Sequence, residues 1–216
     1  MTDLATRIDE VRTRIADAAG RAGRDPSSVT LVGASKTVPA ERLVEAVDAG
    51  LRDLGENRAQ ELLAKAPVLD GAGCAPRWHF VGRLQRNKVA ALAPYVALWH
   101  SVDRLSLGEA MARRAPGARV LVQVDVGDEP QKGGCTPSDT PALADSLRAL
   151  GLDVAGLMTV PPRTADPRAC FATLRELASR VGADELSMGM SEDFEVAVEE
   201  GATIVRVGRA IFAPRA

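Results

Sequence analysis

The chain has 216 residues, of which 46% are hydrophobic and 26% are charged, a composition typical of globular proteins rather than of disordered or fibrous ones. The net charge of −2 lacks the basic excess that nucleic-acid backbones attract, so we expect no nucleic-acid partner. No apolar stretch is as long as a membrane span, and the charged, periodic N-terminal segment is unlike a secretory signal. We therefore expect no membrane partner and a cytoplasmic location.

The cysteines and histidines do not form a metal-binding pattern. Cys74, Cys135 and Cys170 lie far apart, and His79 and His100 belong to no carboxylate-histidine cluster. We therefore expect free thiols in a reducing compartment and no metal site.

Strand and helix patterns alternate along the chain. Residues 3–23 have apolar positions three and four apart, which predicts a helix before the first strand. Short apolar runs then predict eight strands, at 29–34, 52–54, 78–81, 96–101, 119–124, 154–158, 185–188 and 203–207. A helical pattern follows each of the first seven runs: at 40–49, one that begins near 58, at 85–93, at 104–114, one that ends near 150, at 167–181 and at 194–200. Residues 70–76 are expected to form a loop.

This alternation predicts a parallel sheet covered by helices on both faces. Eight such units favour an α/β fold of one domain over residues 1–216, a single (β/α)8 TIM barrel preceded by an N-terminal helix. An open doubly wound sheet is the alternative, but no glycine-rich fingerprint follows the first strand.

Lys36 directly follows the first predicted strand, where barrel enzymes build their sites. In a partly apolar barrel mouth, desolvation would favour the neutral amine over the ammonium ion. A neutral amine attacks an aldehyde to give a Schiff base, the chemistry of carbonyl substrates and of pyridoxal phosphate. The alternative is that Lys36 extends into solvent or pairs with a carboxylate such as Glu56.

Two glycine-bearing loops follow the last two predicted strands. Ser187, Gly189 and Ser191 precede a predicted helix, and Gly208 follows the eighth strand. Free backbone N–H groups at such positions bind phosphate, and barrels commonly place a phosphate site at these two loops. The alternative for Ser191 is an ordinary helix N-cap.

Arg206 and His79 each have a structural alternative to a ligand-binding role. Arg206 lies inside an apolar run, so its guanidinium either forms a buried ion pair or donates to a ligand nitrogen or carboxylate. His79 stands between Trp78 and Phe80, where a histidine with satisfied core contacts is the commoner case.

Seven segments together resemble the pyridoxal phosphate homeostasis (YggS/PROSC) family, which is related to the barrel domain of alanine racemase. In chain order they are LVGASKTVPAERL, DLGENRAQE, WHFVGRLQRNKV, HSVDRL, VLVQVDVGDEPQKGGC, GLMTVPP and LSMGMSEDFEVAVEEGATIVRVGRAIF. The resemblance implies a fold-type III pyridoxal phosphate barrel without the second, β-rich domain. This chain departs from the family pattern at Arg83, where a histidine is common, and at Arg209, where a hydroxyl residue is common.

The resemblance also implies the roles of individual residues. Lys36 would hold pyridoxal phosphate as an internal aldimine, the loops 187–191 and 206–209 would hold its phosphate, and Arg206 would face its pyridine nitrogen. Asn57 and His79 would line the same mouth. The implied cofactor-binding set contains no catalytic residue and comprises Lys36, Asn57, His79, Ser187, Gly189, Met190, Ser191, Arg206 and Gly208.

The implied function is the homeostasis of pyridoxal phosphate, and with it of vitamin B6 and of the amino-acid and keto-acid balance. An arginine at the pyridine nitrogen weakens the ring as an electron sink, and racemases of this fold use a tyrosine from a second domain, whereas the only tyrosine here is Tyr95. We therefore expect a carrier rather than an enzyme, with apoenzymes that use pyridoxal phosphate as partners, and a monomer or weak dimer. The alternatives are an amino-acid racemase that uses pyridoxal phosphate and a Schiff-base aldolase that uses Lys36 without a cofactor.

Overall fold

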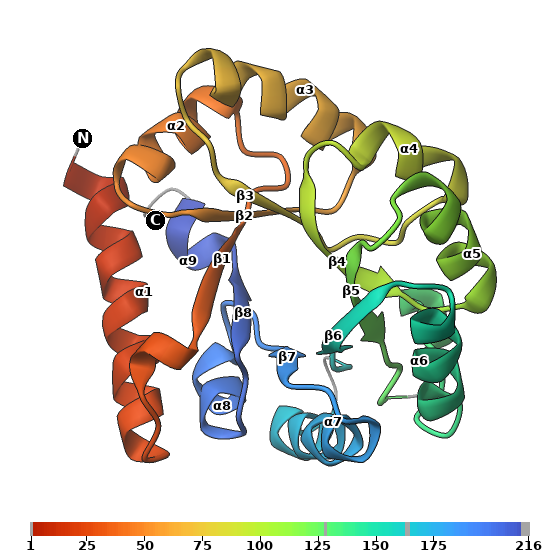
Figure 1. Cartoon of the computed structure of the whole chain (residues 1–216). Coiled ribbons are helices and arrows are strands. Elements are labelled where there is room, and N and C mark those ends of the chain that lie inside the picture. Colours follow the sequence, from red (N-terminus) through yellow and green to blue (C-terminus); the bar gives the residue numbers. More distant parts are fainter. Residues whose placement is uncertain (1, 128, 163–164, 213–216) are drawn as a thin grey trace.

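Eight parallel strands close into a barrel at the centre of the molecule (Figure 1). The computed structural model describes residues 2–127, 129–162 and 165–212. Each strand pairs in parallel with the next one along the chain, and β8 closes the ring by pairing with β1. The strands are β1 (Thr30–Ala34), β2 (Asp53–Glu56), β3 (Arg77–Phe80), β4 (Val96–Val102), β5 (Arg119–Gln123), β6 (Asp153–Met158), β7 (Glu185–Ser187) and β8 (Ile204–Val207). The (β/α)8 prediction is confirmed, and the open sheet is excluded.

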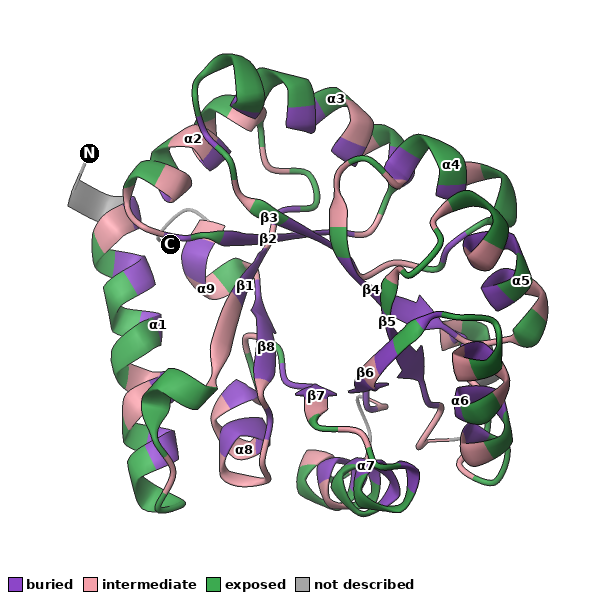
Figure 2. Ribbon diagram, viewed as in Figure 1, coloured by how far each residue is buried: buried purple, intermediate pink, exposed green. Residues whose placement is uncertain are grey.

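Helices surround the barrel, with their buried faces turned toward the strands (Figure 2). They are α1 (Thr2–Arg21), α2 (Ala40–Asp48), α3 (Ala59–Gly71), α4 (Val89–Leu92), α5 (Leu105–Arg114), α6 (Thr140–Ala149), α7 (Pro167–Val181), α8 (Phe194–Glu199) and α9 (Arg209–Phe212). The described residues also form three short 3-10 helices: η1 (Pro26–Ser28), η2 (Arg86–Lys88) and η3 (Pro130–Lys132). The extra helix α1 packs against α8 and α9. None of the described helices is long and apolar enough to cross a lipid bilayer.

The apolar core has two parts. The larger part fills the layer between the strands and the helices. The smaller part lies inside the barrel and consists of Val32, Leu98, Leu121, Met158 and Ile204. The remaining interior is polar, because His79, His100, Ser187 and Arg206 are all buried there.

Three boundaries differ from the sequence prediction for identifiable reasons. The strand expected at 52–54 continues to Glu56, whose buried carboxylate is bonded by Lys65 from the next helix. Helix α3 continues through Pro67 to Gly71, so the loop expected at 70–76 begins later. The helix expected at 85–93 is a 3-10 turn followed by the short helix α4, and Pro94 prevents a longer one.

Candidate functional site

Lys36 follows β1, with Ser35 between them, at the end of the barrel where the strands finish, which we call the mouth. Its side chain is exposed, and its ammonium group has no polar partner among the residues that the structure describes. The expected desolvation of Lys36 is therefore wrong, and so is the suggested pairing with Glu56, which bonds Lys65 instead at 2.5 Å. The remaining alternative, extension of Lys36 into solvent, is the one observed, and no described side chain competes with a ligand for its amino group.

A buried ion cluster holds the strand end that precedes Lys36. The ammonium group of Lys65 donates to the Ser35 carbonyl oxygen at 2.9 Å and to Glu56 Oε1 at 2.5 Å. The Ser35 hydroxyl also donates to Glu56 Oε1, at 2.8 Å. Because the Glu56 side chain is fully buried, these contacts fix Ser35 relative to β2 and α3.

The residue that follows Lys36 is held by the same cluster. Glu61 Oε2 accepts from Lys65 Nζ at 2.8 Å and from the backbone N–H of Thr37, also at 2.8 Å. Thr37 has a φ of 62°, which is costly for a β-branched residue. Such a conformation persists only where surrounding contacts impose it, and here they fix the backbone on both sides of Lys36.

Lys36 shares a hollow with the loop that follows β8. This hollow has a volume of about 450 Å³ and includes Lys36, Pro39, Gly208, Arg209 and Phe212 among its lining residues. A Cβ atom on Gly208 would lie 3.2 Å from the carbonyl oxygen of Ala34, so a side chain there would crowd the end of β1. The structure therefore places Lys36 beside the loop that follows β8, which is one of the two loops predicted to bind phosphate.

The second predicted phosphate loop lies beside the first. The Ser191 hydroxyl oxygen accepts from the backbone N–H of Ala210 at 3.4 Å, which joins the β7–α8 loop to α9. The alternative of Ser191 as the N-cap of α8 is wrong, because Asp193 occupies that position. Met190 is exposed at the loop tip, and its N–H donates to Asp193 Oδ1 at 2.6 Å.

Gly189 sets the path of this loop. Its φ is 91°, and a Cβ atom would lie only 2.6 Å from the Cβ atom of Ala197 in α8. Its carbonyl oxygen accepts from the backbone N–H of Arg206 at 2.9 Å. Glycine is thus required both by the backbone conformation and by the close approach of α8.

Arg206 is buried in the barrel without an ion-pair partner among the described residues. Its guanidinium donates to the Ser187 hydroxyl oxygen and, at 2.8 Å, to the carbonyl oxygen of Thr159. The structural alternative of a buried ion pair is therefore wrong. Burial lowers the pKa of Arg206 to about 10, so the group remains a cation at neutral pH, with further N–H donors available to a ligand.

A chain of buried hydrogen bonds continues from Arg206 through the barrel interior. Ser187 Oγ lies 2.8 Å from His100 Nδ1, His100 Nε2 lies 2.9 Å from His79 Nδ1, and His79 Nε2 lies 3.0 Å from Asp53 Oδ1. We call Ser187, His100, His79 and Asp53 the interior chain. Because a carboxylate can only accept, the whole chain is satisfied when both histidines are neutral and protonated on Nε2.

Two members of the interior chain, His100 and Asp53, have shifted pKa values. Burial lowers the pKa of His100 well below its usual value, and the nearby His79 and Arg206 act in the same direction. For Asp53 burial acts to raise the pKa, but hydrogen bonds from His79 and Arg77 outweigh it and hold the pKa below its usual value. Both shifts favour a neutral imidazole at His100 and a carboxylate at Asp53.

Two predicted site residues therefore lie deeper than expected. His79 was expected at the mouth, but it is buried inside the barrel with both ring nitrogens bonded to protein. Ser187 was expected in the phosphate loop, but its hydroxyl lies at the Arg206 end of the interior chain. Ser187 contacts Arg206, and His79 is connected to Ser187 only through His100. Neither they nor Arg206 line the hollow beside Lys36.

Asn57 follows β2 at the mouth and carries an unsatisfied acceptor. Its Oδ1 atom is buried and has no hydrogen-bond partner among the described residues. A buried amide oxygen of this kind costs free energy unless a donor reaches it. Together with the free amine of Lys36 and the two glycine loops, it makes a set of groups that fits an aldehyde bearing a phosphate.

The roles of Lys65, Glu61 and Asp53 were not predicted from the sequence. The spacing of four residues between Glu61 and Lys65 is an ordinary helix pair, and nothing in it indicates that Lys65 also reaches Ser35. Asp53 was predicted only as a strand residue. Its partner His79 belongs to the neighbouring strand, so no local sequence pattern links the two.

Comparisons with known proteins agree with this geometry. Residues 7–215 match the alanine racemase N-terminal domain family. The pyridoxal phosphate homeostasis protein of Pseudomonas aeruginosa is 45% identical over 225 residues, covering 100% of this chain and 97% of that protein. The protein of the same name from Aquifex aeolicus is 44% identical, with 97% of each chain covered.

Solved structures have the same barrel. PipY of Synechococcus elongatus, with pyridoxal phosphate bound, is 34% identical and matches with a TM-score of 0.81 over 92% of this chain and 100% of that one. A Chlorella virus arginine decarboxylase, at 15% identity and a TM-score of 0.72, covers 96% of this chain and 63% of that one, and it shares the fold alone. This chain belongs to the pyridoxal phosphate homeostasis protein family, built on the alanine racemase N-terminal barrel.

Proposed function

We propose that this protein binds pyridoxal phosphate at the barrel mouth through Lys36 and holds it for supply to other proteins, as a homeostasis protein rather than an enzyme. The observation that carries the proposal is that Lys36, with a free amine, and Gly208 line one hollow of about 450 Å³. When bound, pyridoxal phosphate supplies an aldehyde carbon that is electrophilic toward an amine. The relatives named above support the same conclusion.

We assign the phosphate to the two loops that Ser191 joins. The backbone N–H groups of Gly189 and Ser191 and those near Gly208 are the donors, because glycine allows a phosphate to approach the backbone closely; the N–H of Met190 is already bonded to Asp193. Arg209 is engaged with Glu192 at 2.6 Å on the surface, so we do not give its guanidinium a phosphate-binding role. Asn57 lines a hollow other than that of Lys36, and its unsatisfied Oδ1 atom would accept a hydrogen bond from a donor there.

Arg206 is the group we place at the pyridine nitrogen. It is a buried cation held on one side by Ser187 and Thr159, and a cation beside that nitrogen discourages its protonation. His79 then contributes through the interior chain, by fixing Ser187 and hence Arg206. An unprotonated ring is a poor electron sink, which favours holding the cofactor over carbanion chemistry.

The position of Tyr95 supports a carrier role. Tyr95 directly precedes β4, so it lies at the end of the barrel opposite Lys36. The phenol group therefore cannot exchange protons with a ligand held at the mouth. This counts against an amino-acid racemase built from the described residues alone.

We further propose that residues 1–216 work as one cofactor-binding domain in the cytoplasm, as a monomer or weak dimer that transfers the cofactor to apoenzymes and does not bind nucleic acid. The three cysteines are free, as in a reducing compartment. The exposed large apolar side chains lie on separate elements, at Val68, Leu105, Leu150 and Met190, so the described surface presents no extended apolar patch for a stable dimer.

Titration with pyridoxal phosphate tests the proposal. We expect the wild-type protein to gain a visible absorbance band that Lys36→Ala lacks, while Lys88→Ala, which removes another lysine near the mouth, keeps it. The loaded protein should restore activity to an apo-aminotransferase and should not racemise amino acids. An unchanged band in Lys36→Ala would remove Lys36 from the site, and racemisation would replace the carrier role with an enzymatic one.

A further inference from the structure

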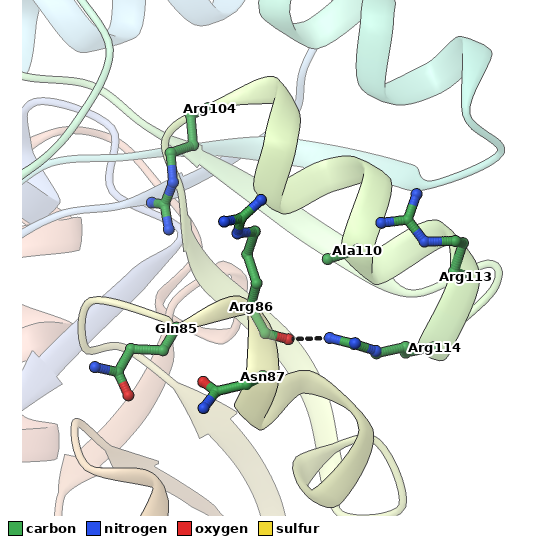
Figure 3. Close-up of a pocket in the computed structure, with 7 residues that line it drawn as sticks. All are labelled: Gln85, Arg86, Asn87, Arg104, Ala110, Arg113 and Arg114. Carbon is green, nitrogen blue, oxygen red and sulfur yellow. Dashed lines mark hydrogen bonds between the residues drawn. The ribbon is translucent and has the colours of Figure 1, made fainter.

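A second hollow lies on the outside of the barrel, between η2 and α5, and Lys36 is not among its lining residues (Figure 3). Its volume is about 530 Å³, within the usual range of small-molecule sites. Four of its seven lining residues are arginines, namely Arg86, Arg104, Arg113 and Arg114, and the others are Gln85, Asn87 and Ala110. No acidic side chain lines it.

Two of these arginines are fixed in place by the protein. Arg114 donates to the carbonyl oxygen of Arg86 at 2.5 Å, and Arg104 donates to the carbonyl oxygen of Leu84 at 3.2 Å and to Asp103. These bonds tie α5 and its preceding loop to η2, so the walls of the hollow are held together. Figure 3 shows the guanidinium groups of Arg86 and Arg113 turned toward the space beside Ala110.

Within the described part of the chain, Arg104 is ion-paired with Asp103, but most of the positive charge in this region is not neutralised. Among the described residues Arg86, Arg113 and Arg114 have no carboxylate within ion-pair distance, and the same holds for the neighbouring Arg83 and Lys88. Arg83 and Lys88 line an adjoining hollow that shares Gln85 and Arg104 with the first. A chain with a net charge of −2 thus gathers unpaired cations in one concave region, where like charges focus the electrostatic field on an incoming anion.

We propose that the hollow between η2 and α5 is a binding site for a small organic anion with two or more phosphoryl groups, separate from the Lys36 site. Guanidinium groups bind phosphate oxygens in a bidentate manner. Because η2 supplies Arg86 and α5 supplies Arg113, a ligand with two or more phosphoryl groups can accept from guanidinium groups of both walls. The amides of Gln85 and Asn87 add neutral donors for the organic part of the ligand.

Calorimetric titration of the full chain with inorganic tripolyphosphate tests this site. The informative variant is Arg86→Gln combined with Arg113→Gln, because neither side chain has a hydrogen bond in the described structure, so the fold keeps the Arg104 and Arg114 contacts. Arg180→Gln is the matched control, since Arg180 is an exposed arginine in the last turn of α7. Inorganic phosphate serves as the single-phosphoryl comparison.

We expect tripolyphosphate to bind the wild-type protein and Arg180→Gln equally, inorganic phosphate to bind more weakly, and the double variant to bind at least about tenfold more weakly than wild type. Raising the salt concentration should weaken binding to the wild type. Pyridoxal phosphate uptake at Lys36 should be the same in all three proteins, which separates this site from the mouth and confirms that the variants fold.

Equal tripolyphosphate binding by the double variant and the wild type would overturn the proposal, and so would an absence of binding at millimolar concentration. If polyglutamate bound this face while tripolyphosphate did not, the site would be a surface for an acidic polypeptide and the small-molecule assignment would be wrong.

Discussion

Lys36 differs from the other lysines of the chain in what holds its backbone. The residue before it is bonded by Lys65, and the residue after it is bonded by Glu61 and has a φ of 62°. The side chain itself remains free at the surface. The fixed backbone before and after Lys36 therefore determines where its side chain starts, and the side chain itself is not held by polar contacts.

Lys65→Met should lower the free energy of unfolding by roughly 3–5 kcal/mol, because it leaves the buried Glu56 carboxylate without its cation. Lys65→Met combined with Glu56→Gln should recover part of that loss, since the uncompensated charge is gone. Denaturant unfolding measures both, and a double variant no more stable than the single one would contradict the account. Pyridoxal phosphate should also bind the single variant more weakly, because the turn around Lys36 loses its support.

At the residue scale the sequence identified Lys36 but not its environment. The position of Lys36 after a predicted strand was sufficient to place it at the mouth. Its support could not be predicted, because the contact from Lys65 to Ser35 joins residues 30 positions apart and depends on how α3 packs on the barrel. The same holds for His79, whose partner Asp53 lies on the adjacent strand.

The helices and strands whose bounds were predicted most accurately are those whose ends have local sequence signals, such as a capping residue or a glycine. Helix α7 was predicted at 167–181 and spans Pro167–Val181, because Asp166 caps its first turn and Gly182, with a φ of 60°, ends it. Strand β2 was predicted too short, because Glu56 stays in a strand only when a cation from another element meets it.

The loop between β7 and α8 gives a prediction at the scale of an element. Gly189→Ala should lower the free energy of unfolding by roughly 1–3 kcal/mol, because the new methyl group meets Ala197 at 2.6 Å and the φ of 91° is unfavourable for alanine. It should also weaken pyridoxal phosphate binding by displacing the loop. Thermal and denaturant unfolding, with a cofactor titration, measure both effects.

Gly20→Ala is the control for this change. Gly20 lies in α1, and a Cβ atom there would meet no atom within 4 Å. Alanine should therefore raise the free energy of unfolding by about 0.5–1 kcal/mol and leave cofactor binding unchanged. Equal stability of the two variants would show that the backbone at Gly189 is not constrained as described.

Across the whole molecule, the alternation of strands and helices was sufficient to predict the closed barrel, because each unit repeats the same local pattern. The interior chain could not be predicted, since it joins residues from β2, β3, β4 and β7 that only the closed barrel brings together. The sequence indicated polar groups at the strand ends, and the structure shows that several of them form one buried network.

This network predicts a pH dependence of stability. The pKa of His100 is lowered in the folded state, so the unfolded chain binds the extra proton first as the pH falls below about 6.5. The free energy of unfolding should then decrease by up to about 1.4 kcal/mol per pH unit for this group. Above pH 6.5 the contribution is fully present.

Denaturant unfolding of wild type and His100→Gln between pH 7.5 and 5.0 measures this contribution. The slope of the wild type should exceed that of the variant, which cannot take up the proton. Glu185 has a pKa raised by burial and acts in the opposite direction, but it is present in both proteins and cancels in the difference. Identical slopes would show that folding does not lower the pKa of His100.

The most direct test of the central claim is to reduce the protein loaded with pyridoxal phosphate with borohydride and locate the modified peptide by mass spectrometry. We expect one pyridoxyl group, on Lys36, in the wild-type protein. A pyridoxyl group on Lys65, Lys88 or Lys132 instead, or no covalent adduct at all, would contradict it.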